Sequence, residues 1–233
     1  MYNDLENKVL QRTHELFQEK KKSDDLLLNI LPEDVANELK QTGRAKPRRY
    51  DLVTVMFTDF KDFTAKSESL SPEELVTIVD NCFKKFDEIT AKYNIEKIKT
   101  IGDAYLCVSG LPKPGDHNAC NVVNAALEIV AYIMELKAVN ELTSVPTFDI
   151  RIGIHTGPIV AGVVGNKKFA YDIWGDTVNT AARMEQTSET NKINISESTY
   201  NLVKNDFVCQ SRGKQFAKNK GMIDMFYVES VKG

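Results

Sequence analysis

Two aspartates stand beside sheet-forming runs in a pattern that suits metal-assisted phosphate chemistry. Asp59 closes an apolar, β-rich run over residues 53–58, and Asp103 follows Gly102 at the tip of a predicted hairpin over residues 98–106. A Gly-Asp pair supplies the positive φ that a two-residue turn needs. If the two strands are neighbours, the carboxylates converge and can share hard divalent cations. Aspartate beside glycine is also common in turns, so the pair alone leaves a purely structural role open.

A mixed sheet covered by helices is predicted to hold these acids. Ser71, followed by Pro72 and by Glu74, forms a capping box that begins a helix. Another helix is expected over residues 117–139. Because strands and helices alternate before a last strand at 223–229 pairs back, the order indicates an α+β or α/β protein.

An alternating strand is predicted over residues 148–155. Its period of two places Arg151 and His155 on the face opposite three isoleucines. The segment 156–158, which contains glycine and proline, is expected to end this strand before another begins over residues 159–164.

A helix near residue 176 carries the next polar pair. Asn179 and Arg183 stand four residues apart, which places them on one helix face. Asp176 is the expected N-cap of this helix. Farther along, Lys218 and Lys220 belong to a basic stretch with the character of a solvated loop.

The N-terminal region is predicted to be helical and separate from the domain that follows. Residues 1–30 contain no glycine or proline, and their apolar residues keep a rough heptad interrupted by polar seam positions. This pattern predicts a marginal coiled-coil linker, with a single solvated helix as the alternative. Residues 31–49 are expected to form a short helix and a basic connector, and residues 50–233 the globular domain.

Composition favours an ordinary globular protein. Of the 233 residues, 42% are hydrophobic and 27% charged, and a net charge of −3 gives no signal for nucleic-acid binding. Four cysteines without C-x-x-C spacing indicate free thiols in a reducing compartment. No apolar run reaches the roughly 20 residues that span a bilayer, which predicts a soluble, cytoplasmic fragment. Because the chain opens directly into a helix, we expect an upstream sensor or membrane domain in the full-length protein.

Several motifs occur together in an order that resembles the class III nucleotidyl cyclases, specifically adenylyl cyclase catalytic domains. The resemblance covers roughly residues 50–230 and rests on four runs and Arg183: Phe57-Thr58-Asp59-Phe60, Lys99-Thr100-Ile101-Gly102-Asp103, Arg151-Ile152-Gly153-Ile154-His155-Thr156-Gly157 and Tyr171-Asp172-Ile173-Trp174-Gly175-Asp176-Thr177-Val178-Asn179. It implies an α+β ferredoxin-like palm with a mixed sheet. It also implies a homodimer with composite active sites between the two copies.

The resemblance assigns roles to individual residues. Asp59 and Asp103 match the metal-binding aspartates, which implies two Mg²⁺ or Mn²⁺ ions per site. Asn179 and Arg183 match the catalytic pair from the partner copy. The remaining matched positions imply contacts with substrate: Lys99, Asp172, Arg151, Phe60, and Lys218 with Lys220 as its alternative.

The base can be predicted from hydrogen-bond chemistry. Lys99 can only donate and an ionised Asp172 can only accept, which complements adenine and opposes guanine. Guanylyl cyclases are similar but typically carry Glu where this chain has Lys99. We therefore expect an adenylate cyclase that converts ATP to 3′,5′-cyclic AMP and pyrophosphate. The alternatives are a guanylate cyclase and a catalytically idle nucleotide-binding or dimerisation domain; a diguanylate cyclase lacks support because no Gly-Gly-Asp/Glu-Glu-Phe run is present.

Overall fold

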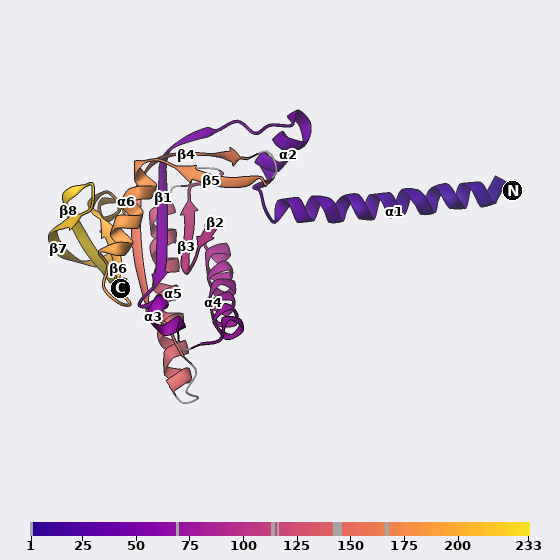
Figure 1. The fold of residues 1–233 in the computed structure, drawn as a ribbon. Helices are drawn as coiled ribbons and strands as arrows, with labels where there is room; N and C mark the ends of the chain where they lie inside the picture. Colours follow the sequence, from indigo (N-terminus) through magenta and orange to yellow (C-terminus); the bar gives the residue numbers. More distant parts are fainter. Residues whose placement is uncertain (1, 69, 113–114, 116, 142–145, 166–167) are drawn as a thin grey trace. The chain divides into compact units, whose positions relative to one another are not determined.

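The computed structural model of the protein describes residues 2–233 except 69, 113–114, 116, 142–145 and 166–167. The described chain divides into two units: unit 1 comprises Met1–Pro47 and Gly162–Asp172, and unit 2 comprises Arg48–Ala161 and Ile173–Gly233. Figure 1 labels the helices and strands. The elements in chain order are α1 (Tyr2–Leu28), α2 (Glu33–Thr42), β1 (Arg48–Phe60), α3 (Phe63–Ser67), α4 (Pro72–Lys92), β2 (Glu96–Ile101), β3 (Ala104–Ser109), α5 (Asn118–Glu141), β4 (Ile150–Val164), β5 (Ala170–Trp174), α6 (Asp176–Gln186), β6 (Ile193–Ser196), α7 (Glu197–Val203), β7 (Phe207–Ala217) and β8 (Gly221–Val231).

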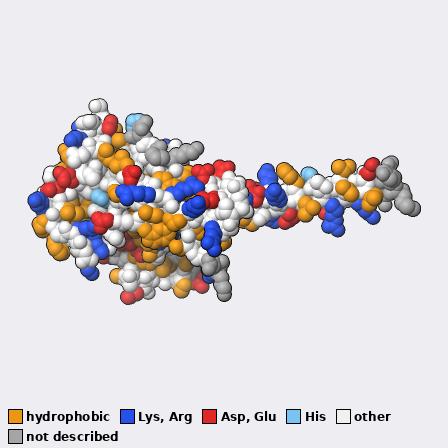
Figure 2. All heavy atoms as spheres, turned by 90° about the horizontal axis from the view of Figure 1, so that it is seen from above, with side chains coloured by type: hydrophobic (Ala, Val, Ile, Leu, Met, Phe, Trp, Pro, Cys, Tyr) orange, Lys and Arg blue, Asp and Glu red, His pale blue; other side chains and the backbone are white. Residues whose placement is uncertain are grey.

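Unit 1 contains the predicted N-terminal helix. Hydrophobic and charged side chains are interspersed along α1 (Figure 2), and Leu5, Val9 and Leu16 are exposed. Nζ of Lys40 on α2 lies 2.7 Å from Oδ1 of Asp24 on α1. Pairing of α1 with another helix stays a prediction.

Helix α2 ends at a glycine. Gly43 ends α2 in the left-handed conformation, with φ 73°, and its N–H donates to the carbonyl of Leu39.

Among the helices of the described residues, none combines the length and apolar character that membrane crossing requires.

A single mixed sheet confirms the predicted fold class. Within the described residues it has eight strands in the order β2-β3-β1-β4-β6-β8-β7, with β5 paired to β4. The pairs are antiparallel except β4 with β6, which run parallel. β1 lies between β3 and β4, so residues near its end neighbour both the β2–β3 hairpin and the start of β4.

The two faces of β4 are covered by different helices. Ile150, Ile152 and Ile154 are fully buried in the core, together with residues of α4 and α5, as the alternation predicts. The opposite face carries Arg151 and Gly153 and receives α6. The sheet is therefore sandwiched, with the charged residues of β4 on the α6 side.

The hairpin and the first capping box form as predicted. Ile101 pairs with Ala104 across the turn, and Gly102 has φ 63°, which Gly adopts without the steric cost that a Cβ brings. The hydroxyl of Ser71 accepts from the N–H of Glu74, whose carboxylate accepts from the N–H of Ser71.

The break expected at 156–158 is wrong, because β4 runs continuously from Ile150 to Val164. Gly157 pairs with Val53 and Ile159 with Tyr50, so β1 has two residues opposite Pro158. This bulge lies where the proline lacks an N–H, and the ladder continues on either side of it.

One other local expectation is wrong, and another holds only in part. The N-cap of α6 is Gly175, with φ 146°, and Asp176 is the first helical residue. The basic stretch is a turn at Lys218 and Lys220, as expected, but Lys214 lies on β7, which pairs with β8. The apolar residues of β7 are confined to its two ends, and the register shifts between Ser211 and Lys214, so its middle lacks the alternation from which strands are predicted.

Candidate active site

The two predicted acids lie where β1 ends and the β2–β3 hairpin turns. Asp59 lies at the end of β1, and Asp103 lies in the β2–β3 turn beside it. Burial raises the pKa of Asp103, and the Asp59 carboxylate raises it further through its charge and a side-chain hydrogen bond. The two carboxyl groups are thus neighbours.

Arg151 provides positive charge next to this pair. It is directly opposite Asp59 in the β1–β4 register, and its Nη2 lies 2.7 Å from Oδ2 of Asp59. The same Nη2 lies 2.9 Å from Oε1 of Glu185 on α6. Within one chain, the guanidinium expected at the substrate phosphates is therefore held between two carboxylates.

Glu185 is the site residue that the sequence analysis missed. It is 6% exposed, and burial raises its pKa to about 7, with Asp59 and Asp103 adding to the rise and Arg151 opposing it. Its Oε1 and the Nε of Arg151 are buried and, among the described residues, have no aligned hydrogen-bond partner. Glu185 and Arg151 are therefore held together by their opposite charges rather than by a well-aligned hydrogen bond. One signal was available: an acid two residues after Arg183, on the apolar side of an amphipathic helix.

Close packing of α6 on β4 brings Glu185 to this position. A Cβ at Gly153 would lie 1.9 Å from the backbone N of Glu185, so only a glycine lets the helix backbone lie directly on the strand. From the neighbouring strand β6, Nδ2 of Asn194 donates to the carbonyl of Met184 at 2.8 Å. Arg151 is two residues from Gly153 and shares its face.

The outer face of α6 carries the predicted catalytic pair. The buried residues of α6 include Thr177, Ala181 and Glu185, whereas Asn179 is exposed and Arg183 donates to Oε1 of Gln186. The structure thus places Asn179 and Arg183 together, but on a different helix face from the one that reaches Asp59.

A second polar cluster lies at the start of α6. Nζ of Lys220 pairs with the carboxylate of Asp176, while Lys218 is exposed in the β7–β8 turn. Nδ1 of His155 lies 2.7 Å from Oγ of Ser196 on β6. Burial lowers the pKa of His155 to about 4, with Lys220 also lowering it and Asp176 opposing.

The remaining predicted substrate residues lie in different places. Lys99 is exposed on β2 in unit 2, and Asp172 is half-buried on β5 in unit 1. Phe60 is 2% exposed and packs against Phe83 and Phe148. Any contact of Phe60 with a substrate would therefore be made by its backbone.

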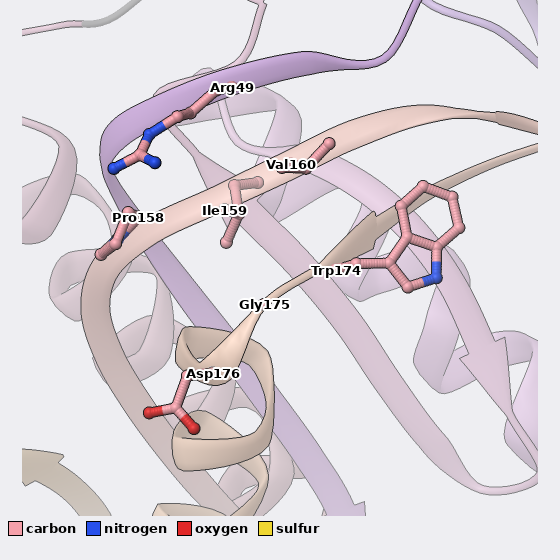
Figure 3. A pocket seen from close by; sticks show the side chains of 7 residues that line it. All are labelled: Arg49, Pro158, Ile159, Val160, Trp174, Gly175 and Asp176. Atoms are coloured by element: carbon pink, nitrogen blue, oxygen red, sulfur yellow. The ribbon is translucent and has the colours of Figure 1, made fainter.

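A hollow of about 230 Å³ opens between β1, β4 and the start of α6 (Figure 3). Trp174 flanks it, and the carboxylate of Asp176 lies at its lower edge on the first turn of α6. The lining residues are Arg49, Pro158, Ile159, Val160, Trp174, Gly175 and Asp176. Asp59 and Asp103 are not among them, so this hollow is not the site of the acids.

The donor set at the acids fits a divalent cation that also binds substrate. In the described part of the chain, no group of three or more His, Cys, Asp or Glu side chains is arranged to hold a metal. Two facing carboxylates are nonetheless what Mg²⁺ typically takes from a protein when waters and substrate phosphates complete its octahedron. Asp59 and Asp103 would be those ligands.

Comparison with known proteins supports this interpretation. Guanylate cyclase 32E of Drosophila melanogaster is 40% identical over 230 residues, 97% of this chain and 20% of that protein. An adenylate cyclase of Mycobacterium bovis is 38% identical over 208 residues, 89% of this chain and 46% of that protein. The guanylate cyclase domain of RhGC from Catenaria anguillulae, solved with GTP, has a TM-score of 0.74 at 36% identity and covers 79% of this chain and 100% of that chain.

The chain spans less than half of either curated relative, 20% of one and 46% of the other. Residues 45–230 match the family model described as the adenylate and guanylate cyclase catalytic domain. With its mixed sheet and paired acids, the chain therefore belongs to this family of nucleotidyl cyclases, whose catalytic domains generally use divalent metal ions.

Proposed function

We propose that this chain is the catalytic domain of an adenylate cyclase, which converts ATP to 3′,5′-cyclic AMP and pyrophosphate. The observation that carries cyclase chemistry is the meeting of Asp59 and Asp103 beside Arg151. The choice of ATP rests on Lys99 and Asp172, because a lysine only donates and an ionised aspartate only accepts. Adenine offers the complementary acceptor at N1 and donor at N6.

At the α-phosphorus, the reaction makes one bond and breaks one. The ribose 3′-oxygen attacks the α-phosphorus, the bond to the β-phosphate oxygen breaks, and the hydroxyl proton leaves to solvent. Two Mg²⁺ or Mn²⁺ ions, when bound, would lower the pKa of the 3′-hydroxyl and offset the triphosphate charge. Asp59 and Asp103 hold these cations in our proposal, and Arg151 and Lys218 contact the β- and γ-phosphates, with Lys220 as the alternative to Lys218.

Two copies of the chain build each site in this proposal. Asn179 and Arg183 lie on the outer face of α6, whereas Glu185 on its buried face is the residue that reaches Arg151 and Asp59. This arrangement supports a homodimer in which the partner's α6 faces the acids. There Asn179 orients the ribose, and Arg183 stabilises charge on the α-phosphate through its planar fork.

A substrate comparison tests the choice of base. Purified protein with Mn²⁺ should cyclise ATP with a higher kcat/KM than GTP. Lys99→Glu should lower kcat/KM for ATP by about 10- to 100-fold, because a mismatched acceptor leaves polar groups unpaired. Lys214→Glu makes the same charge change on β7 and should leave the preference intact. Wild-type preference for GTP, or a Lys99→Glu variant as fast with ATP, would contradict the proposal.

Guanylate cyclase activity is the second candidate function. Guanylate cyclase 32E and the GTP-bound RhGC domain are similar to this chain at 40% and 36% identity, and this similarity favours GTP. The same assay decides between the two nucleotides. A protein that dimerises but turns over neither would instead be a catalytically idle domain.

We further propose that α1 links this domain to an upstream sensor or membrane domain. The matched relatives are longer than this chain, and α1 exposes apolar residues at rough heptad spacing, among them Leu5, Val9 and Leu16. Pairing of α1 with the partner's α1 would bury them. Removal of residues 1–28 should then weaken dimerisation, as measured by analytical ultracentrifugation.

A further inference from the structure

Glu185 stands out among the buried polar groups because the proposed reaction gives it no role. Its side chain is 8% exposed, and its charged neighbour Arg151 reaches it through the Nη2 that also contacts Asp59. One guanidinium nitrogen is thus shared by two acids, one proposed to bind metal and one not. Burying a carboxylate is costly unless it is paired, and Arg151 is the partner that makes the buried position of Glu185 tolerable.

We propose that Glu185 is a positioning residue that controls how firmly Arg151 holds Asp59. This inference rests on the proposed cyclase function. With both acids present, the positive charge of Arg151 is divided between them, and Asp59 stays able to exchange Arg151 for a cation. When a cation occupies Asp59, Glu185 keeps Arg151 in place beside the site, where its other donors can contact substrate phosphate.

The alternative arrangement without Glu185 shows why this matters. Arg151 would then have Asp59 as its single acid partner, and a planar guanidinium binds one carboxylate with two parallel hydrogen bonds. A metal ion would have to break both of these hydrogen bonds to reach Asp59. Loss of Glu185 should therefore weaken metal binding, although Glu185 itself does not contact the metal.

The position of Glu185 is fixed by backbone rather than by a flexible side chain. The backbone of Met184 and Glu185 lies directly on Gly153, and Asn194 holds the carbonyl of Met184. A carboxylate on a rigid helix segment can keep a guanidinium in one place, which a residue on a mobile loop could not do.

Binding of Mn²⁺ alone, measured by electron paramagnetic resonance, tests the proposal without catalysis. Glu185→Gln keeps the shape of the side chain and removes its charge. Its affinity for Mn²⁺ should fall by about 10- to 100-fold, the usual effect of losing a group that orients a metal ligand. Glu189→Gln removes an exposed acid from the segment after α6 and should leave Mn²⁺ affinity unchanged. Thermal unfolding of both variants checks that they are folded at the temperature of the titration.

A double-mutant cycle with Arg151→Met shows whether Glu185 acts through Arg151. In that background Glu185→Gln should change Mn²⁺ affinity far less than in the wild type. An equal loss in both backgrounds would mean that Glu185 acts as a remote charge, and an unchanged affinity in Glu185→Gln would mean that it does not position Arg151; either result overturns the proposal. Failure of the cyclase function would appear separately, as absence of cyclic nucleotide from a wild type whose Mn²⁺ binding still depends on Glu185.

Discussion

Replacement of Gly153 by alanine should displace the helix that carries Glu185. The new Cβ would lie 1.9 Å from the N of Glu185, 2.5 Å from its Cα and 2.5 Å from the carbonyl carbon of Met184. All three are backbone atoms, so no side-chain rotation relieves the contact. Since carbon contacts are optimal at about 3.5–4.0 Å, α6 must move away from β4 by roughly 1.5–2 Å.

The energetic cost can be worked out from the groups that move. Overpacking a tight core contact costs about 1–3 kcal/mol. The hydrogen bond from Asn194 to the carbonyl of Met184, now 2.8 Å, would be broken by such a shift, and a buried polar group left unpaired costs about 1–3 kcal/mol more. We therefore expect Gly153→Ala to lower the free energy of unfolding by about 2–6 kcal/mol, a large part of a typical domain's stability.

Urea denaturation of Gly153→Ala and Gly157→Ala provides the measurement and its control. A Cβ at Gly157 would meet a side-chain atom, Oγ1 of Thr177, at 2.6 Å; rotation of Thr177 relieves that contact without moving backbone, at the cost of the hydrogen bond from Thr177 to the carbonyl of Pro158. Gly157→Ala should therefore be the milder variant. The reasoning is refuted if Gly153→Ala unfolds within about 1 kcal/mol of the wild type, the size of an ordinary substitution, or if Gly157→Ala is the more destabilised variant.

Two further predictions concern the titration of His155 and the sharing of sites between copies. The folded pKa of His155 is about 4, below its ordinary value of 6.5, so the unfolded chain binds the proton first and stability should fall by about 3 kcal/mol as pH drops from about 6.5 to about 4. Denaturation curves of wild type and His155→Gln across this range should diverge, and parallel curves would show that burial of the imidazole is not the cause. Mixing Asp103→Ala with Arg183→Ala chains, each inactive alone, should restore up to about a quarter of wild-type activity, since half of the dimers are mixed and one of their two symmetric sites is intact. An inactive mixture that nevertheless contains mixed dimers would contradict sites shared between chains.

Local chemistry made several features of this protein predictable from sequence alone. The Gly102-Asp103 turn needs only a residue that tolerates positive φ, and the cap at Ser71 needs only its neighbours within one turn. The buried face of β4 follows from the alternation of isoleucines. In each case the residues that decide the structure are adjacent in sequence, and no distant group competes with them.

Other features depended on residues far away in sequence. Pro158 stays within β4 because β1, about 100 positions earlier, bulges opposite it. Asp176 does not cap α6; its carboxylate pairs with Lys220, and Gly175 takes the cap position. A sequence window around either residue contains no trace of its partner, so local rules gave the wrong expectation.

The candidate site shows the same division between local and distant determinants. Asp59 and Asp103 were identified from their positions at strand ends, and Arg151 from its matching family motif, but their sequence order did not show that Arg151 pairs with Asp59. Glu185 lies 34 positions after Arg151, and the two meet because Gly153 has no side chain and α6 can rest on the strand backbone. The sequence determined which chemical groups are available, and tertiary packing decided which charges face one another, because that depends on the distance between backbones rather than on spacing along the chain.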